Sequence, residues 1–284
     1  MEIFYNELSR EPIADNKEEA RQKIITLLKT LKILREKDIN IMRTHDGFYA
    51  DIIAPDYSFS DFYNDPLVSN MLKILLRTVA VNPFIYDEDS YEAEVFVMNN
   101  FSVDNHLQQQ VCSEGLACAH IFNSPVISLS GHVHWEKDYL PLTIQEPSNG
   151  ENKYVKDIPN VYSSASILSN AFITWYDSLT KSIQLNTEEN IYKLFPKEKF
   201  DFENKAINDI ISWYYDDKRF LLRINELIND IILNPFFGGI GKTESLIGTD
   251  GKASKRIAKK DRIIYTYTKD KITIHQCRGH YDDK

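Results

Sequence analysis

From residue 200 onward the chain changes to a pattern that few small folds satisfy, with amphipathic helices followed by short strands in the last 85 residues. The segment 204–215 suits one helix and 216–232 a second, with apolar residues at helical spacing at Phe220, Ile224, Leu227, Ile228 and Ile231. A short strand at 200–202 precedes them. Strand-like runs follow at 253–258, 262–268 and 271–277, the last two joined as a hairpin at Lys269-Asp270. This order predicts an α+β unit in which helices pack on an antiparallel sheet.

The length of the chain predicts a second domain before this unit. A chain of 284 residues exceeds the usual size of one compact domain. Between Leu185 and Lys199 the polar residues 186–189 are suited to cap a connecting helix that ends before Pro196. We therefore expect one domain over residues 1–190 and another over residues 196–284.

The larger N-terminal domain also shows mixed helix and strand patterns. Helical spacing occurs at 16–37, 58–81, 113–122 and 163–185. Strand-like runs occur at 39–54, 93–98, 126–130 and 139–144, and residues 146–152 read as a loop. These patterns predict an α+β domain whose role the sequence does not identify.

Charge is distributed unevenly between the two parts. Residues 1–200 hold 18 Lys and Arg against 29 Asp and Glu, a net charge of −11, whereas residues 201–284 hold 15 against 13, a net charge of +2. From Gly251 onward 10 basic residues face 4 acidic ones. A basic segment attached to an acidic body is typical of a phosphate-binding module joined to another domain.

Hydropathy and cysteine content indicate a cytoplasmic protein with no structural metal. No apolar run is long enough to span a bilayer, and the first residues lack a signal-peptide pattern. The three cysteines, Cys112, Cys118 and Cys277, include no second pair that would complete a zinc site, so we expect free, buried thiols.

Two further motifs give weaker hypotheses. The glycine-rich run 238–243 resembles a phosphate-binding loop, but Phe236 occupies the position where that motif needs its first glycine. His132, His134 and Glu136 alternate, so on a strand they would face one side as metal ligands can. The other interpretation of this alternation is an exposed strand end. A tightly bound metal there would make the N-terminal domain the enzyme.

The C-terminal segment combines the residue types that metal-free RNA cleavage needs. These are Glu244, Arg256, Arg262, Arg278, His280 and Tyr281. The reaction requires a base for the 2′-hydroxyl proton, cations that stabilise the charged phosphorane, and an acid for the leaving 5′-oxygen. By composition alone a solvated charged surface explains the same residues.

Their order and spacing favour a specific family. Residues 200–281 resemble the YoeB/Txe family of the RelE toxin superfamily. The resemblance rests on segments that follow one another in the family's order: Trp213 to Arg219, Arg223 to Asp230, Pro235-Phe236, Gly241 to Leu246, Gly251, Ser254 to Ile257, Asp261 to Tyr265 and Cys277 to Tyr281.

The resemblance implies roles residue by residue. Glu244 matches the general base, Arg262 the arginine that stabilises the transition state, and His280 the general acid. Tyr281 matches the tyrosine that shapes the site. The implied substrate contacts are Lys242, Arg256 and Arg278. No metal ion or other cofactor is implied.

The implied function is that of a metal-independent RNA endonuclease, an mRNA interferase with a RelE-like fold that cuts mRNA on the ribosome and so inhibits translation. Such toxins are held inactive by a separate antitoxin, and a homodimer is a further expected partner; no membrane is. Residues 1–190 are expected to regulate the toxin or sense a signal, as in a toxin–antitoxin system or in phage defence. The alternative is a non-catalytic module that keeps the toxin fold and binds RNA or a partner.

Two departures from the family pattern bear on activity. Residues 282–284 place two acidic side chains beside His280 and Tyr281. Acidic neighbours favour a protonated imidazole, which suits a general acid, but they repel RNA. Gly279 stands where the family has a larger residue. We expect both departures to weaken cleavage.

Overall fold

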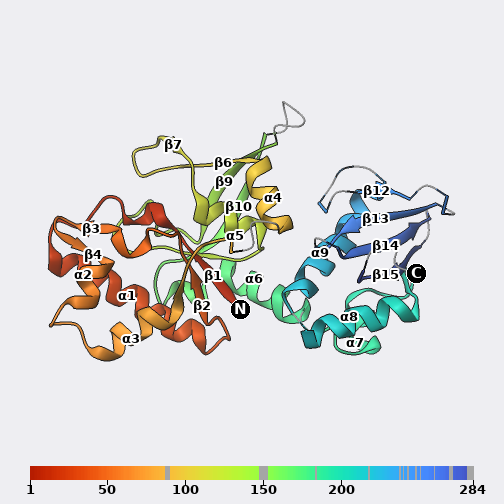
Figure 1. Ribbon diagram of the computed structural model, residues 1–284, viewed down its shortest axis with the longest axis horizontal. Coiled ribbons are helices and arrows are strands. Elements are labelled where there is room, and N and C mark those ends of the chain that lie inside the picture. Colours follow the sequence, from red (N-terminus) through yellow and green to blue (C-terminus); the bar gives the residue numbers. More distant parts are fainter. Residues whose placement is uncertain are drawn as a thin grey trace. The chain divides into compact units, whose positions relative to one another are not determined.

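A computed structural model divides the chain into two compact units, Met1–Trp175 and Tyr176–Lys284, which are described separately (Figure 1). The division falls earlier in the chain than the boundary expected between Leu185 and Lys199. The residues that the structure describes are 1–86, 90–146, 153–182, 184–216, 218–236, 238, 240–241, 243–246, 248–249, 251–258, 260–268 and 271–279.

The N-terminal unit is built on a mixed sheet whose described strands have the order β5-β2-β1-β8-β10-β9-β6-β7. The strands β1, β2, β5 and β8 and the end of β10 run parallel, and β9, β6 and β7 continue the sheet antiparallel. Their bounds are β1 Glu2–Tyr5, β2 Ile41–Arg43, β5 Ala80–Val81, β6 Asn100–Asp104, β7 Gln110–Val111, β8 Val126–Ile127, β9 Tyr139–Gln145 and β10 Lys153–Val161. The predicted mixture of helix and sheet is confirmed, although the parallel half was not anticipated.

Helices connect these strands. The first, α1 (Lys17–Arg35), starts where Asn16 accepts a hydrogen bond from the backbone N–H of Glu19, as expected of an N-cap. The other described helices are α2 Phe59–Asn64, α3 Asn70–Val79, α4 Tyr91–Met98 and α5 Glu114–Ile121. Helix α6 (Asn170–Ser182) includes the position at which the two units divide. Short 3₁₀ turns η1 Glu7–Arg10, η2 Phe48–Ala50 and η4 Ser166–Leu168 and the hairpin β3 Ile52–Ala54 with β4 Tyr57–Ser58 complete the unit. Helices α2 and α3 both contact α1.

Two predictions in this unit are wrong. The run 93–98 was expected to be a strand, but it forms α4, because Ser90 caps the helix and Glu92 and Glu94 lie in its first turn. The residues 132–136 form a turn rather than a strand. His132, His134 and Glu136 therefore do not share one face of a sheet.

The C-terminal unit packs helices against a five-stranded sheet of order β11-β15-β14-β13-β12. Strands β12 to β15 are antiparallel, and β11 pairs parallel with β15. The elements are α7 Glu188–Leu194, β11 Phe200–Phe202, α8 Asn204–Asp216, α9 Arg219–Leu233, β12 Glu244–Ser245, β13 Lys252–Arg256, β14 Arg262–Tyr267 and β15 Ile272–Gln276. The two predicted helices and the predicted α+β arrangement are confirmed, whereas the expected hairpin turn at Lys269-Asp270 lies outside the described residues.

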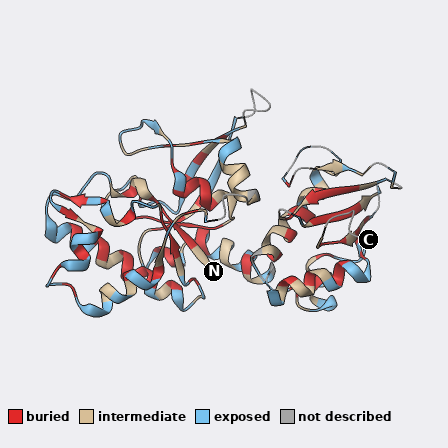
Figure 2. Cartoon of the chain, viewed as in Figure 1, coloured by how far each residue is buried: buried red, intermediate tan, exposed pale blue. Residues whose placement is uncertain are grey.

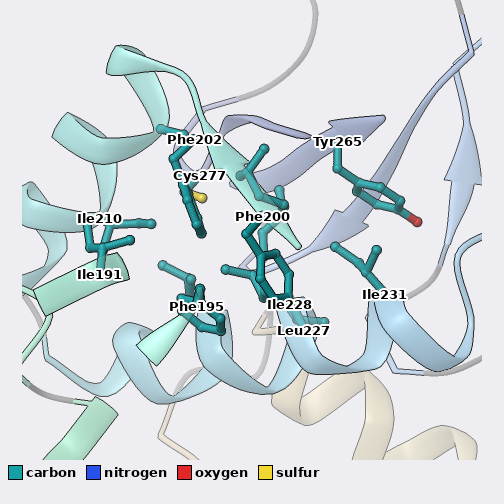
Figure 3. Packing of buried hydrophobic residues seen from close by; sticks show 14 of the residues in the cluster. Ile191, Phe195, Phe200, Phe202, Ile210, Leu227, Ile228, Ile231, Tyr265 and Cys277 are labelled. Carbon is teal, nitrogen blue, oxygen red and sulfur yellow. The ribbon is translucent and has the colours of Figure 1, made fainter. Parts of the chain in front are cut away.

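The core of this unit joins the sheet to the apolar faces of the helices (Figure 3). From α9 it contains Leu221, Ile224, Leu227, Ile228 and Ile231, so the predicted apolar face is confirmed apart from Phe220, which is only partly buried. The cluster also contains Leu185, Ile191 and Phe195. Residues 185–195 thus belong to the C-terminal core, which explains the earlier division. In Figure 2 the strands at the centre of both sheets are largely buried.

Within the described residues, no helix combines the length and the apolar character required to cross a membrane.

Candidate active site

Pairing of the strands brings three predicted site residues to one face of the C-terminal sheet. Glu244 of β12 lies opposite Ser254 of β13, and Arg256 of β13 lies opposite Arg262 of β14. Residues directly opposite each other in an antiparallel pair share a face, as do residues two apart on one strand. Glu244, Arg256 and Arg262 therefore project from the same face.

The other face of the same strands is turned to the core. Ala253, Ile263 and Tyr265 belong to the buried cluster formed with α8 and α9. The helices thus cover one face only, and the face with Glu244 and the two arginines is the one that lacks them. A carboxylate beside two guanidinium groups can take up a proton and bind an anion at one place.

Arg262 also has a structural role. Only 7% of it is exposed, and its Nη1 donates to the carbonyl oxygens of Ala258 at 3.0 Å and Asp261 at 3.1 Å. These bonds hold the turn between β13 and β14. Its cross-strand neighbour Arg256 carries the same charge, and like charges directly opposite repel unless an anion lies near them. An anion that bound near both would offset this repulsion.

Lys255, a buried lysine that was not among the predicted site residues, anchors the loop before Glu244. Lys255 is fully buried, and its Nζ donates to Asp230 Oδ2 of α9 and to Thr243 Oγ1, both at 2.6 Å. It also donates to the carbonyl oxygen of Ile240 at 3.2 Å. The signal was present in the sequence: in β13 the alternation places Lys255 on the side of Ala253, which faces the core, where a charge needs a partner.

Gly241 allows the same loop to pass close to helix α9. Its φ is +82°, and a Cβ there would lie 2.4 Å from Cδ2 of Leu227 and 3.1 Å from the carbonyl oxygen of Arg256. The carbonyl oxygen of Gly241 accepts a hydrogen bond from the N–H of Arg256 at 2.5 Å. Close approach and a left-handed backbone explain a glycine at this position better than phosphate binding does.

Arg278, a predicted substrate contact, lies against helix α8. Its guanidinium lies 4.3 Å from the ring centroid of Trp213, and Nη1 donates to Ser212 at 2.8 Å and to Asp216 at 2.5 Å. The same stretch is held by Asp209, which accepts a hydrogen bond from the N–H of Cys277. Burial raises the pKa of Asp209. These contacts fix the chain as it leaves β15.

Three predicted site residues, Lys242, His280 and Tyr281, lie outside the described residues, as do residues 282–284. The last described residue, Gly279, pairs with the turn that Arg262 holds. Its carbonyl oxygen accepts from the N–H of Arg262 at 3.2 Å, and its N–H donates to Asp261 Oδ1 at 2.8 Å. These two hydrogen bonds therefore join the chain after β15 to Arg262, the first residue of β14, and to Asp261 before it.

A second histidine of this unit, His275, was not singled out by the sequence. Its two ring nitrogens lie 2.6 Å from Thr266 Oγ1 and 2.6 Å from Glu203 Oε1. With both nitrogens engaged, its position indicates a structural role that joins β14, β15 and the start of α8.

Among the described residues there is no group of three or more His, Cys, Asp or Glu side chains that could hold a metal ion. At the hypothesised histidine site, His134 Nε2 lies 2.8 Å from the carbonyl oxygen of Asp104, and Glu136 accepts from the N–H of Gly131 at 2.7 Å. All three cysteines are free; Cys118 and Cys277 are buried as expected, whereas Cys112 is exposed.

Comparisons with known proteins agree on the C-terminal segment. Residues 202–281 match the model of the YoeB-like toxins of bacterial type II toxin–antitoxin systems. The toxin YoeB of Escherichia coli strain K12 is 38% identical over 84 residues, which are 29% of this chain and 99% of that toxin. Two solved structures from Staphylococcus aureus are each 34% identical with a TM-score of 0.28: a YoeB dimer, with 29% of this chain and 97% of that one covered, and a heterotetrameric YoeB–YefM toxin–antitoxin complex, with 30% and 99% covered.

Proposed function

Through residues 202–281 this chain belongs to the family of YoeB-like toxins of type II toxin–antitoxin systems, and from this membership we propose that its C-terminal unit is an RNA endonuclease. One structural observation carries the proposal: the strand register presents Glu244, Arg256 and Arg262 on the sheet face opposite the helices. A base and two cations on one face are what phosphodiester transfer requires.

The proposed reaction proceeds without a metal ion. Glu244 takes the proton of a ribose 2′-hydroxyl while the oxygen of that hydroxyl attacks the adjacent phosphorus. Arg256 and Arg262 stabilise the negative charge that builds up on the phosphoryl oxygens. His280 donates a proton to the departing 5′-oxygen, so that a 2′,3′-cyclic phosphate and a 5′-hydroxyl result. Tyr281 shapes the site and Lys242 contributes a further cation.

The proposed substrate is mRNA held on the ribosome, so that cleavage arrests translation. The C-terminal unit carries only a small positive charge, a net +2 over residues 201–284, so its own attraction for RNA is weak. A ribosome would present the strand to the sheet face that α8 and α9 do not cover. We further propose a separate antitoxin, in keeping with the type II family. A homodimer stays a prediction.

For the N-terminal unit we propose a regulatory role. Its residues carry most of the negative charge of the chain, with a net charge of −11 over residues 1–200. A tethered acidic domain competes with RNA for a basic surface at high local concentration. The sensing or restraining role is proposed for the N-terminal unit and the toxin role for the C-terminal unit, whose core includes Leu185, Ile191 and Phe195.

A non-catalytic RNA-binding module is the second candidate. It is favoured by the engagement of Arg262 and Arg278 with protein atoms, which is typical of structural residues. The two candidates differ in whether single substitutions remove cleavage while leaving binding.

The test is cleavage of a defined mRNA in a reconstituted translation reaction, with 5′ ends mapped by primer extension. Glu244→Gln, Arg262→Ala and His280→Ala should each slow cleavage at least roughly 100-fold, the usual scale for removing a general acid, base or charge stabiliser. Lys193→Gln serves as the matched control, because Lys193 is exposed on α7 and its loss also removes one charge. If all three variants cut like the parent, the binding module is the correct interpretation.

A further inference from the structure

A cavity in the N-terminal unit lies where parallel sheets commonly bind ligands. Along the chain, β1 is followed by β2 and then by β5, which lie one after the other on one side of β1. The next strands of the parallel part, β8 and β10, lie on the other side of β1. In open sheets of this kind, ligands bind beyond the carboxyl ends of the strands, near the point where the strand order reverses. That edge is formed here by the residues after β1, β2 and β5.

The cavity has a volume of about 440 Å³ and opens at this edge. His45 and Asp46, which follow β2, and residues 83–85, which follow β5, form one side. Helices α4 and α5 form the other. The volume falls within the range of small-molecule sites, which is roughly 300 to 1,000 Å³.

The walls of this cavity are mostly apolar and partly aromatic. Phe84 and Phe96 line it, and Cys118 lies on its α5 side with 1% exposure. Phe84 packs with its ring centroid 6.1 Å from that of Phe4 in the core, so this wall is fixed by the fold. Aromatic faces attract organic cations as well as apolar groups.

The ionisable groups at the cavity are acidic. Asp46 and Glu114 line it and are both exposed, so their carboxylates lie at its open side. The pKa of Cys118 is raised first by burial and then by the charges of Glu7 and Glu114, which places Glu7 close as well. His45, which also lines the cavity, has its Nε2 2.9 Å from Asp51 Oδ2.

Phosphate groups are disfavoured here by the fold itself. The start of a helix usually offers N–H groups to an anion. At α5 the N–H groups of Glu114 and Gly115 already donate to the Glu7 carboxylate, at 2.8 Å and 3.0 Å. A nucleotide would meet carboxylates in place of free donors.

We propose that this cavity binds a small organic cation, with an amine at the carboxylates of Asp46 and Glu114 and an apolar body against Phe84 and Phe96. The site lies wholly within the N-terminal unit, and its existence does not depend on RNA cleavage by the other unit.

The test uses the full chain and three probes of one shape: tryptamine, its neutral analogue tryptophol, and the anion indole-3-acetate. Binding is measured by isothermal titration calorimetry at low and at physiological salt. We expect tryptamine to bind roughly three- to tenfold more tightly than tryptophol at low salt, with a smaller ratio as salt screens the exposed carboxylates. Indole-3-acetate should bind most weakly.

Two variants test the geometry. Asp46→Asn combined with Glu114→Gln should reduce the affinity for tryptamine to that for tryptophol. Ala93→Trp, which fills the cavity from α4, should remove binding of both, with circular dichroism used to check its fold. Asp157→Asn is the matched control, because Asp157 is exposed on β10 and does not line the cavity. The proposal is overturned if none of the probes binds, if indole-3-acetate binds as tightly as tryptamine, or if the charge variant keeps the preference for tryptamine.

Discussion

Replacing Lys255 tests whether one buried ion pair stabilises the sheet of the C-terminal unit against α9. Lys255→Met removes the ammonium group that lies 2.6 Å from both Asp230 and Thr243 and keeps a side chain of similar length. Asp230, whose side chain is 12% exposed, loses its cationic partner but keeps hydrogen bonds from the N–H of Ile240 and from Asn234 Nδ2. The carbonyl oxygen of Ile240 loses its donor. Breaking a buried pair from one side costs about 3 to 5 kcal/mol. Because Asp230 keeps some contact with water, we expect the lower end, about 3 kcal/mol.

Native-state hydrogen exchange measures this loss of stability in the C-terminal unit separately from the N-terminal unit. Since each 1.4 kcal/mol corresponds to a factor of ten, amides of β13 and β14 should exchange roughly 100-fold faster in the variant. Amides of β1 and β8, in the other unit, should not change. The surface pair of Lys193 and Glu189 has nearly the same separation, 2.7 Å, but both side chains are exposed, so Lys193→Met should leave exchange unaltered.

A second variant separates charge from packing. Adding Asp230→Asn to Lys255→Met removes the uncompensated carboxylate and should restore part of the protection. The reasoning fails if Lys255→Met changes exchange less than threefold, or if the two substitutions add their costs without any recovery. Cleavage should fall with Lys255→Met as well, because the loop before Glu244 loses its anchor.

Three further predictions follow from the same unit and from the charge of the chain. Gly241→Ala should lower the free energy of unfolding by about 1 to 3 kcal/mol, since its Cβ would meet Leu227 at a φ of +82°, and more than Gly248→Ala, whose Cβ would meet nothing within 4 Å; urea unfolding compares them. Cleavage should persist in EDTA once ribosomes are supplied with the magnesium they need, and loss of cleavage with intact ribosomes would contradict the metal-free mechanism. Residues 176–284, the whole C-terminal unit, expressed alone should arrest growth more strongly than the full chain at matched levels, and equal or weaker arrest would exclude restraint by the acidic part.

The sequence alone determined most of the C-terminal architecture. Helical spacing found the buried stripe of α9 because side chains three and four apart lie on one side of a helix whatever it packs against. The ordered segments from Trp213 to Tyr281 indicated the toxin family before any geometry was known.

Only the tertiary structure decided which polar residues work together. The run 93–98 was predicted to be a strand, whereas the structure places it in α4. The parallel order of β1, β2, β5 and β8 depends on pairing between segments as far apart in the chain as Phe4 and Val126, which no local pattern records. In the same way, alternation along β13 places Lys255 on the core side, but no local pattern names the residue that pairs with its charge. Burial against Asp230 gives it a role, because a charge withdrawn from water must find its partner wherever the fold brings one.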